Sequence, residues 1–440
     1  MTVMTFERDG WIEQDLNDAD ETATFTRLRI SIGNAVVTRN YSRRGGGESA
    51  AINVPLLPLA SFLAQNWWPL LNESLRRYGD EGFQARHRLD AAMHGYAFPV
   101  LGIWSGGDSA VSVDWTVVEE PHSPIDFRTP ALPEPVQIRR GTVEAELMDL
   151  IEATLARLRT SSAAAAKRLR DDWQRVGETL SNPGEAAYCK AAGRLGLDPY
   201  DPETPDLGVF TQDLYPKLFD DISDAVDLPE LGDVTAWTRD AASRLEKCPS
   251  VEVGAFGPPP RDDVQVPPWA IGVGAARQLA ERLGLHQGPR KAVNELLGAA
   301  VKNDANLSRK GPAILTALVQ RRNGVAHVGA IAASARQQRF RACAATFLAW
   351  TADSGDDRAA TVALTRGQQA SRAFAAEMLA PRVYLQERAN RYGFTADDIE
   401  EQASILICPY DTVLWQASRA GIPLRGVDLP TSHRPTFWQT

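Results

Sequence analysis

The chain has 440 residues, of which 44% are hydrophobic and 23% are charged, so it carries enough apolar material for buried cores. Its formal net charge of -9 argues against a general nucleic-acid coat protein, and no run of about 18 purely apolar residues predicts a membrane span. With roughly 100 to 200 residues in a typical domain, this length predicts two to four domains.

The N-terminus lacks a basic segment followed by an apolar one, so no secretory signal is expected and a cytoplasmic location follows. The cysteines Cys189, Cys248, Cys343 and Cys408 are widely spaced and form no Cys-x-x-Cys pair. This spacing predicts reduced, structural thiols and not a disulfide framework or a cysteine zinc site. The acidic balance favours protein or small-molecule partners.

Residues 1–120 predict an N-terminal α+β domain. The many acidic side chains of residues 1–22 indicate an irregular lead-in. Apolar residues then alternate with polar ones, and Gly33-Asn34 predicts a tight hairpin turn, because both residues tolerate positive φ. A second hairpin is predicted within residues 96–117 by a similar alternation on either side of a glycine pair.

Four residues of this domain are tentative binding residues. Arg43 and Arg44 open a glycine-rich loop, which is not a phosphate-binding P-loop because no Lys-Ser/Thr pair follows it. Trp67 and Trp68 lie on a helical stretch and are expected in the core, although an exposed ring would anchor a partner well.

His87 and His94 are seven residues apart and could share a helical face. Zinc sites need about three or more protein ligands, and neither a Cys nor a third His stands near this pair. We therefore predict ordinary polar histidines, with no metal and no cofactor.

Proline-rich stretches and helical periodicity divide the rest of the chain. Residues 121–138 predict an extended linker, and 139–250 an all-helical middle domain. A second proline-rich linker is expected at 251–268, followed by a C-terminal domain over 269–425 and a tail over 426–440.

The C-terminal domain is expected to contain a short hairpin within residues 313–332 and two apolar helices. These helices cover residues 337–350 and 368–381, with a polar stretch at 352–358 between them. The first helix includes Arg339-Phe340, and the second ends in the string Phe-Ala-Ala-Glu-Met-Leu-Ala-Pro.

These two motifs resemble those of the ImmA/IrrE family of zinc metallo-endopeptidases, over roughly residues 265–425. The resemblance implies a mostly helical, zincin-like C-terminal domain with a small sheet. In that family the Arg-Phe helix carries His-Glu-x-x-His, in which two histidines bind zinc and the glutamate activates the zinc-bound water.

In this chain the zinc-binding motif is absent. The five matching positions are Ala344, Ala345, Thr346, Phe347 and Leu348. The family's third ligand, a carboxylate on the next helix, also has no match, since no Asp or Glu lies between Asp357 and Glu377. The resemblance therefore implies a pseudo-enzyme with degenerate positions Ala344, Ala345 and Leu348 and no catalytic residues, and Arg339 is a further tentative binding residue.

Two functions from different classes follow. The first is a non-catalytic pseudo-metallopeptidase that acts as a protein-interaction, sensor or regulatory subunit, in stress response or phage defence as the range of the family implies. The alternative is a DNA-associated transcriptional regulator or nucleic-acid-binding subunit, which would use the helix-turn-helix-like segment 395–422 or the arginines near the first hairpin. Within that segment the second helix offers Gln416 and Arg419 to bases, and its acidic neighbours favour packing. An unrecognised enzyme in the N-terminal domain is disfavoured, because paired histidines and carboxylates are scarce.

Overall fold

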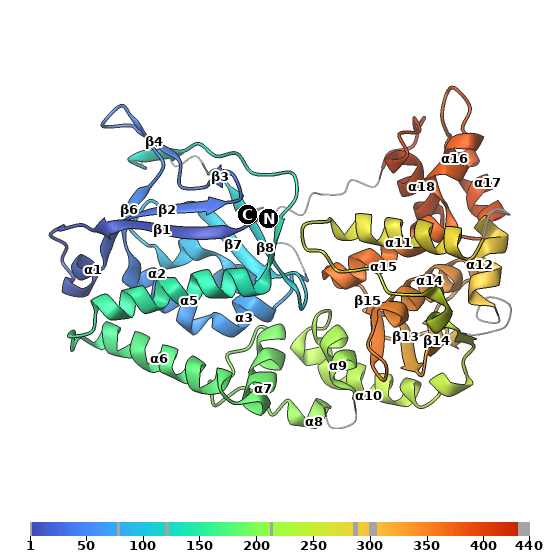
Figure 1. Ribbon diagram of the computed structural model, residues 1–440, viewed down its shortest axis with the longest axis horizontal. Coiled ribbons are helices and arrows are strands. Elements are labelled where there is room, and N and C mark those ends of the chain that lie inside the picture. Colours follow the sequence, from blue (N-terminus) through green and yellow to red (C-terminus); the bar gives the residue numbers. More distant parts are fainter. Residues whose placement is uncertain are drawn as a thin grey trace. The chain divides into compact units, whose positions relative to one another are not determined.

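A computed structural model describes residues 2–76, 80–118, 123–211, 214–284, 289–298 and 306–429. The chain divides into two compact units, one reaching Leu207 and the other starting at Gly208 (Figure 1). Both units combine helices with small, mainly antiparallel sheets, so the α+β class is confirmed. The stretch 139–250 does not form a unit of its own, because its first helices belong to one unit and its last helices to the other. Within the described residues, no helix is both long and apolar enough to cross a membrane.

The first unit contains a four-stranded antiparallel sheet in which β2 pairs with β1 on one side and with β3 and β6 on the other. Its strands are β1 (Met4–Trp11), β2 (Phe25–Ile32), β3 (Ala35–Val36) and β6 (Ile52–Pro55). The predicted turn is confirmed, since Ile32 pairs with Ala35 and Gly33 has a φ of 57°. The expected irregular lead-in is wrong over β1, where Met4 and Phe6 are buried at alternate positions among the acidic residues.

Two three-stranded sheets complete the strands of this unit. The first has the order β10-β8-β7 and the second the order β5-β4-β9. Their strands are β4 (Asn40–Ser42), β5 (Glu48–Ser49), β7 (Val100–Ser105), β8 (Ala110–Thr116), β9 (Ile125–Phe127) and β10 (Val136–Arg139). The β7–β8 pair confirms the second predicted hairpin. Strands β9 and β10 lie in the stretch 121–138, which proline content had indicated as a linker; β10 pairs with β8 because Ile138 supplies a fully buried side chain.

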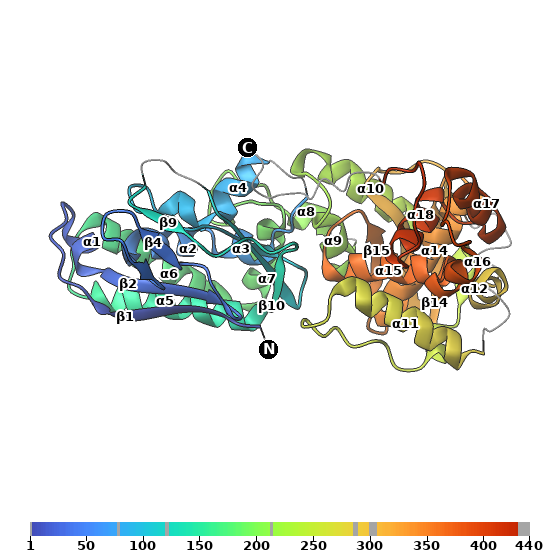
Figure 2. The same cartoon turned by 90° about the horizontal axis from the view of Figure 1, so that it is seen from above.

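Helices pack against the sheet of β1, β2, β3 and β6 and against the sheet of β7, β8 and β10 (Figures 1 and 2). They are α1 (Ala19–Ala23), α2 (Leu56–Gln65), α3 (Trp67–Asn72), α4 (Glu81–His87), α5 (Arg140–Arg157), α6 (Ala164–Leu180) and α7 (Pro183–Arg194), with a 3-10 turn η1 (Leu89–Ala92). Helix α5 runs along β1 and also packs on α2, which contacts α6 (Figure 2). The expected helical period of α5 is confirmed, since Val143, Leu147, Leu150 and Ile151 are all buried.

The second unit is built on a five-stranded sheet of order β11-β14-β13-β15, in which β12 also pairs with β14. Its strands are β11 (Ser250–Val251), β12 (Asn306–Ser308), β13 (Leu315–Arg322), β14 (Val325–Ile331) and β15 (Asp357–Thr361). The predicted hairpin is confirmed as β13–β14, with Asn323 and Gly324 at φ values of 49° and 84° in the turn. Strand β15 extends the sheet from within the stretch that the sequence indicated only as a polar break.

The helices of this unit include α8 (Gly208–Thr211), α9 (Pro216–Ser223), α10 (Leu231–Ala242), α11 (Pro268–Arg282), α12 (Pro289–Leu297), α14 (Ala335–Thr351), α15 (Arg366–Leu379), α16 (Arg382–Arg388), α17 (Ala396–Leu406) and α18 (Tyr410–Arg419). Three 3-10 turns accompany them: η2 (Leu228–Glu230), η3 (Leu245–Lys247) and η4 (Val253–Phe256). Helix α14 packs on β13, β14 and β15, and α15 packs between α14 and α11 (Figure 1). The two predicted apolar helices are therefore confirmed as α14 and α15.

The stretch 251–268, predicted as a second linker, is largely exposed but contributes several buried side chains to the core of this unit. Val253 and Phe256 are buried, and the Phe256 ring meets the Trp350 ring edge-on at 5.7 Å. Trp350 Nε1 also donates a 3.0 Å hydrogen bond to the carbonyl oxygen of Gly257. Proline here shapes an irregular but packed segment. The part of the expected tail from residue 430 onward lies outside the described residues.

Candidate functional site

Helix α14 presents the positions that the family resemblance makes important. It starts at Ser334, whose hydroxyl accepts a 3.3 Å hydrogen bond from the Gln337 backbone N–H. Ala344, Ala345 and Leu348 are all buried, with at most 3% of their surface exposed. These three positions of α14 therefore carry buried, apolar side chains.

The residues around α14 do not fit a zinc ion. Within the described ranges, no group of three or more His, Cys, Asp or Glu side chains could hold a metal. Cys343 of α14 and Cys408 are buried in the same core, and burial raises the pKa of each thiol to about 12. Zinc binds the thiolate form, which burial disfavours in both residues.

The single acidic residue in the Phe-Ala-Ala-Glu string joins three helices. Glu377 of α15 is 3% exposed and accepts a 2.9 Å hydrogen bond from Arg277 Nε of α11. Its other oxygen accepts a 2.8 Å hydrogen bond from Gln416 Nε2 of α18. Its carboxylate thus serves packing, and the string that suggested a peptidase carries a structural contact here.

Side chains cover the outer edge of β15. Ala359 and Thr361 turn their backbone groups away from β13, the strand with which β15 pairs. Asp221 of α9 accepts a 2.9 Å hydrogen bond from the Ala359 N–H. The Gln368 amide donates a 2.7 Å hydrogen bond to the Ala359 carbonyl oxygen and accepts a 2.9 Å hydrogen bond from the Thr361 N–H. Arg372 donates to the Thr361 carbonyl at 3.0 Å. All four outward groups of these two residues are thereby satisfied, and no extended peptide can pair with them without displacing side chains.

Arg358 holds this cover in place. Its guanidinium donates two hydrogen bonds, of 2.7 and 2.9 Å, to the Asp221 carboxylate. The Asp221 side chain is 7% exposed, so water screens this bidentate pair only weakly.

A pocket of about 420 Å³ lies where α14, β15 and α15 meet. One part of its lining is apolar: Phe340, Ala344, Ala360, Val362, Leu364 and Pro409. The other part is polar: Thr316, Gln337, Arg341, Thr361, Gln368, Ser371 and Arg372. Ala344, the first degenerate position, thus faces a cavity of the size that small-molecule sites have.

Arg341 and Arg372 are the functional candidates that the sequence reading missed. Burial lowers the pKa of both guanidinium groups, and that of Arg372 to about 10. A sequence signal for them exists: neither arginine has an acidic residue three or four positions away, and no Asp or Glu occurs from Ala305 to Ala352.

Arg339, which the sequence suggested as a binding residue, is 4% exposed and does not line this pocket. Its Nη1 donates a 2.7 Å hydrogen bond to Asn294 Oδ1 of α12. Burial lowers the pKa of its guanidinium. Arg339 therefore joins α14 to α12 in the interior of the unit.

The tryptophan pair lies in the core, as expected, so neither ring meets the condition of exposure under which it was considered as a partner anchor. Trp67 and Trp68 are 3% and 2% exposed. Trp67 meets Trp173 edge-on at 5.2 Å, and Trp68 Nε1 donates a 2.9 Å hydrogen bond to the Tyr200 hydroxyl. Both rings hold α3 against later helices, as their helical periodicity suggested.

The loop arginines are at the surface. Arg43 Nε donates a 2.8 Å hydrogen bond to Asp126 of β9, and Arg44 is exposed.

His87 is fully buried, with Nδ1 2.6 Å from the Ile103 carbonyl oxygen and Nε2 3.0 Å from Glu73. These contacts give His87 the structural role that was predicted for it.

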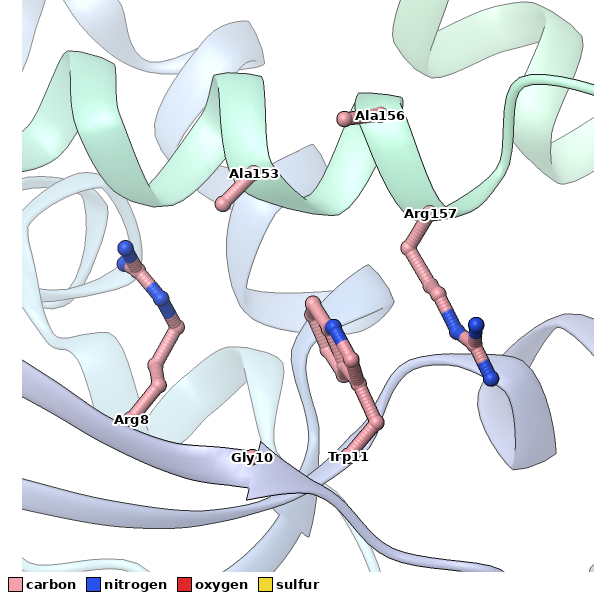
Figure 3. A pocket seen from close by; sticks show the side chains of 6 residues that line it. All are labelled: Arg8, Gly10, Trp11, Ala153, Ala156 and Arg157. Carbon is pink, nitrogen blue, oxygen red and sulfur yellow. The ribbon is translucent and has the colours of Figure 1, made fainter.

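A shallow surface hollow of about 450 Å³ lies between β1 and α5 (Figure 3). Trp11 projects from the end of β1 between Arg8 and Arg157, and Ala153 and Ala156 face it from α5 (Figure 3). The Arg157 guanidinium lies 5.8 Å from the Trp11 ring centroid. Arg8 pairs with Asp149 at 2.5 Å, so one of the two cations around this ring is already neutralised.

Of the two side chains considered for DNA reading, Gln416 is buried and Arg419 is exposed. Gln416 is 1% exposed and bonded to Glu377, so it cannot reach a base edge. Helix α17 starts with a capping box between Thr395 and Asp398. The carboxylates of Asp397 and Asp398 in its first turn stabilise the helix N-terminus and would repel phosphate. Near the first hairpin, Arg39 and Arg43 are paired with Glu48 and Asp126.

Comparison of the chain with family models, with curated proteins and with solved structures finds no match. The geometry of the second unit is therefore the basis for any functional proposal.

Proposed function

We propose that this protein is a non-catalytic relative of the ImmA/IrrE peptidases that works as a sensor or regulatory subunit. The observation that carries the proposal is the packing of α14: Ala344, Ala345 and Leu348, which match positions of the family's zinc-binding motif, are buried apolar residues. Alanine and leucine side chains offer no lone pair to zinc and no base to water.

The order of elements supports the resemblance at the level of architecture. A short sheet is followed by an apolar helix on its face, an edge strand, a second apolar helix and a closing helical pair, α17 and α18. This arrangement is compatible with a zincin-like domain from which the chemistry has been lost.

The covered edge of β15 gives a second, independent reason against peptide hydrolysis. A protease that holds an extended substrate uses free backbone groups at a sheet edge, because strand pairing aligns the scissile bond. Here Asp221, Gln368 and Arg372 occupy those groups. The unit retains a pocket, but the outward backbone groups of Ala359 and Thr361 are not available to pair with a peptide.

Metal analysis and a hydrolysis assay on the full-length protein test the proposal. We expect substoichiometric zinc after purification from zinc-supplemented cells, and no cleavage of unstructured protein substrates with or without added zinc. Stoichiometric zinc together with chelator-sensitive cleavage would overturn it.

A further inference from the structure

The pocket at α14, β15 and α15 holds positive charge without a counter-ion. Among the described residues that line it, the charged ones are Arg341 and Arg372. Arg341 Nη1 donates to the Ile331 carbonyl oxygen, and Arg372 donates to the carbonyl oxygens of Thr361 at 3.0 Å and Ala363 at 2.8 Å. Across the described residues, neither guanidinium forms an ion pair with a carboxylate.

Both arginines keep donors available. A guanidinium has five N–H groups, of which these hydrogen bonds use one in Arg341 and two in Arg372. In the described part of the chain, their remaining nitrogen atoms are not among the buried atoms that lack a partner. Those nitrogens therefore reach solvent, and an anion in the pocket could accept hydrogen bonds from them.

An anion would also relieve an electrostatic penalty. Two partly desolvated cations line one cavity with no acidic residue among the lining side chains. Burial lowers the pKa of both groups, which is the expected sign for cations that lack a neutralising partner. A carboxylate or phosphate would accept charge-assisted hydrogen bonds from both.

The rest of the pocket fits an apolar body. Val362 and Leu364 are 51% and 36% exposed at the pocket, and Phe340 and Ala344 continue the apolar lining from α14. The volume of about 420 Å³ lies within the range of small-molecule sites, which is about 300 to 1,000 Å³. The covered edge of β15 removes an extended peptide from the candidate ligands.

We propose that this pocket binds a small amphipathic anion, in which a carboxylate or phosphate group contacts Arg341 and Arg372 and an apolar chain lies against Phe340, Val362 and Leu364. The inference rests on the proposed function in one respect, since it names the class of molecule that the sensor detects. Binding itself can be measured independently of that function.

Titration calorimetry of the full-length protein at low ionic strength tests the ligand class. The probes are octanoate and octyl phosphate, with octylamine as a cation of the same chain and inorganic phosphate as an anion without one. We expect at least one octyl anion to bind, octylamine not to bind, and inorganic phosphate to bind at least tenfold more weakly. The tighter of the two anions identifies the head group. Equal affinity for octanoate, octyl phosphate and octylamine, or no binding of either octyl anion, would overturn the proposal.

Variants locate the site. Arg341→Gln removes one charge, and Val362→Glu adds an opposing charge at an exposed position that needs no repacking. Each is expected to weaken binding at least tenfold, which corresponds to about 1.4 kcal/mol. Val383→Glu is the matched control, because Val383 is 56% exposed on α16 and outside the pocket, and it should leave the affinity unchanged. Folded Arg341→Gln and Val362→Glu proteins that bind as tightly as the parent would refute the assignment.

The two proposals can fail separately. Stoichiometric zinc with peptide cleavage would refute the proposed non-catalytic function. It would not refute the pocket assignment, if anion binding still depends on Arg341. A zinc-free, inactive protein that binds neither octyl anion would remove the pocket assignment alone.

Discussion

Gln416 of α18 donates a 2.8 Å hydrogen bond to the buried carboxylate of Glu377, which lies 39 residues earlier on α15. The same carboxylate accepts a 2.9 Å hydrogen bond from Arg277 of α11. One acidic side chain therefore fixes three helices relative to one another, which gives the Glu of the Phe-Ala-Ala-Glu string a structural role.

Replacing this carboxylate should loosen the second unit. We expect Glu377→Ala to lower the free energy of unfolding by about 2 to 4 kcal/mol, because Gln416 and Arg277 lose their acceptor, with some relief since Arg277 is half-exposed. Urea unfolding measures the change. Glu387→Ala, at an exposed position of α16, is the control and should stay within about 0.5 kcal/mol of the parent. Similar losses in both variants would contradict the role given to Glu377.

The first unit should lose stability in acid through Glu73. Burial alone would raise the pKa of this carboxyl, but hydrogen bonds from His87 and Arg86 outweigh it and lower the pKa from 4.5 to about 2. A depressed folded pKa means that the stabilisation is complete above pH 4.5 and is lost as the pH falls toward 2.

Glu73→Gln should therefore be less stable than the parent by about 2 to 3 kcal/mol at neutral pH, with a difference that shrinks between pH 4.5 and 2. Urea midpoints measured across this range check the effect. Glu81→Gln, at an exposed position of α4, should show no such convergence. A Glu73→Gln deficit that does not change with pH would refute the linkage.

Two glycines of α11 should respond in opposite directions to alanine. A Cβ on Gly272 would lie 2.1 Å from the Ala370 carbonyl oxygen of α15, whereas a Cβ on Gly274 would have no neighbour within 4 Å. We expect Gly272→Ala to destabilise the protein by about 1 to 3 kcal/mol, because α11 and α15 must separate. Gly274→Ala should stabilise it by about 0.5 to 1 kcal/mol through helix propensity. Thermal unfolding of the two variants measures these changes in stability. If both variants were stabilised or both destabilised, the close contact between α11 and α15 would be absent.

The cysteines should differ in reactivity toward thiol reagents. Burial raises the pKa of Cys343 and Cys408 to about 12 and that of Cys189 to about 11, while Cys248 is only partly buried. At neutral pH we expect Cys248 to react first with an aromatic disulfide reagent. Cys248→Ser should remove this fast phase, and the other thiols should react only as the chain unfolds. A fast phase that survives the substitution would place the reactive thiol elsewhere.

Local patterns predicted the elements whose causes are local. The turns at Gly33 and at Asn323-Gly324 follow from residues that accept positive φ, and α14 follows from a long uninterrupted apolar helix pattern. The strands β9 and β10 were missed because the proline content of residues 121–138 suggested a linker. Apolar and polar residues do alternate in β10, but over only four positions.

The candidate site could be predicted only in part, because tertiary contacts create it. Asp221 and Gln368 are 147 residues apart, yet both meet the edge of β15. The residues near β15 show no pattern that predicts hydrogen bonds between distant side chains and its backbone groups. The two pocket arginines could have been found from their acid-free surroundings, but the cavity between them requires the packing of α14 on β15.

The cover on β15 also bears on how copies of this protein behave toward one another. A bare sheet edge is a template on which a second molecule can add its own strand, and repeated addition leads to fibrils. With the outward groups of Ala359 and Thr361 already bonded, growth cannot begin there. The β15 edge is thus protected from self-assembly at high protein concentration by the side chains of Asp221, Gln368 and Arg372.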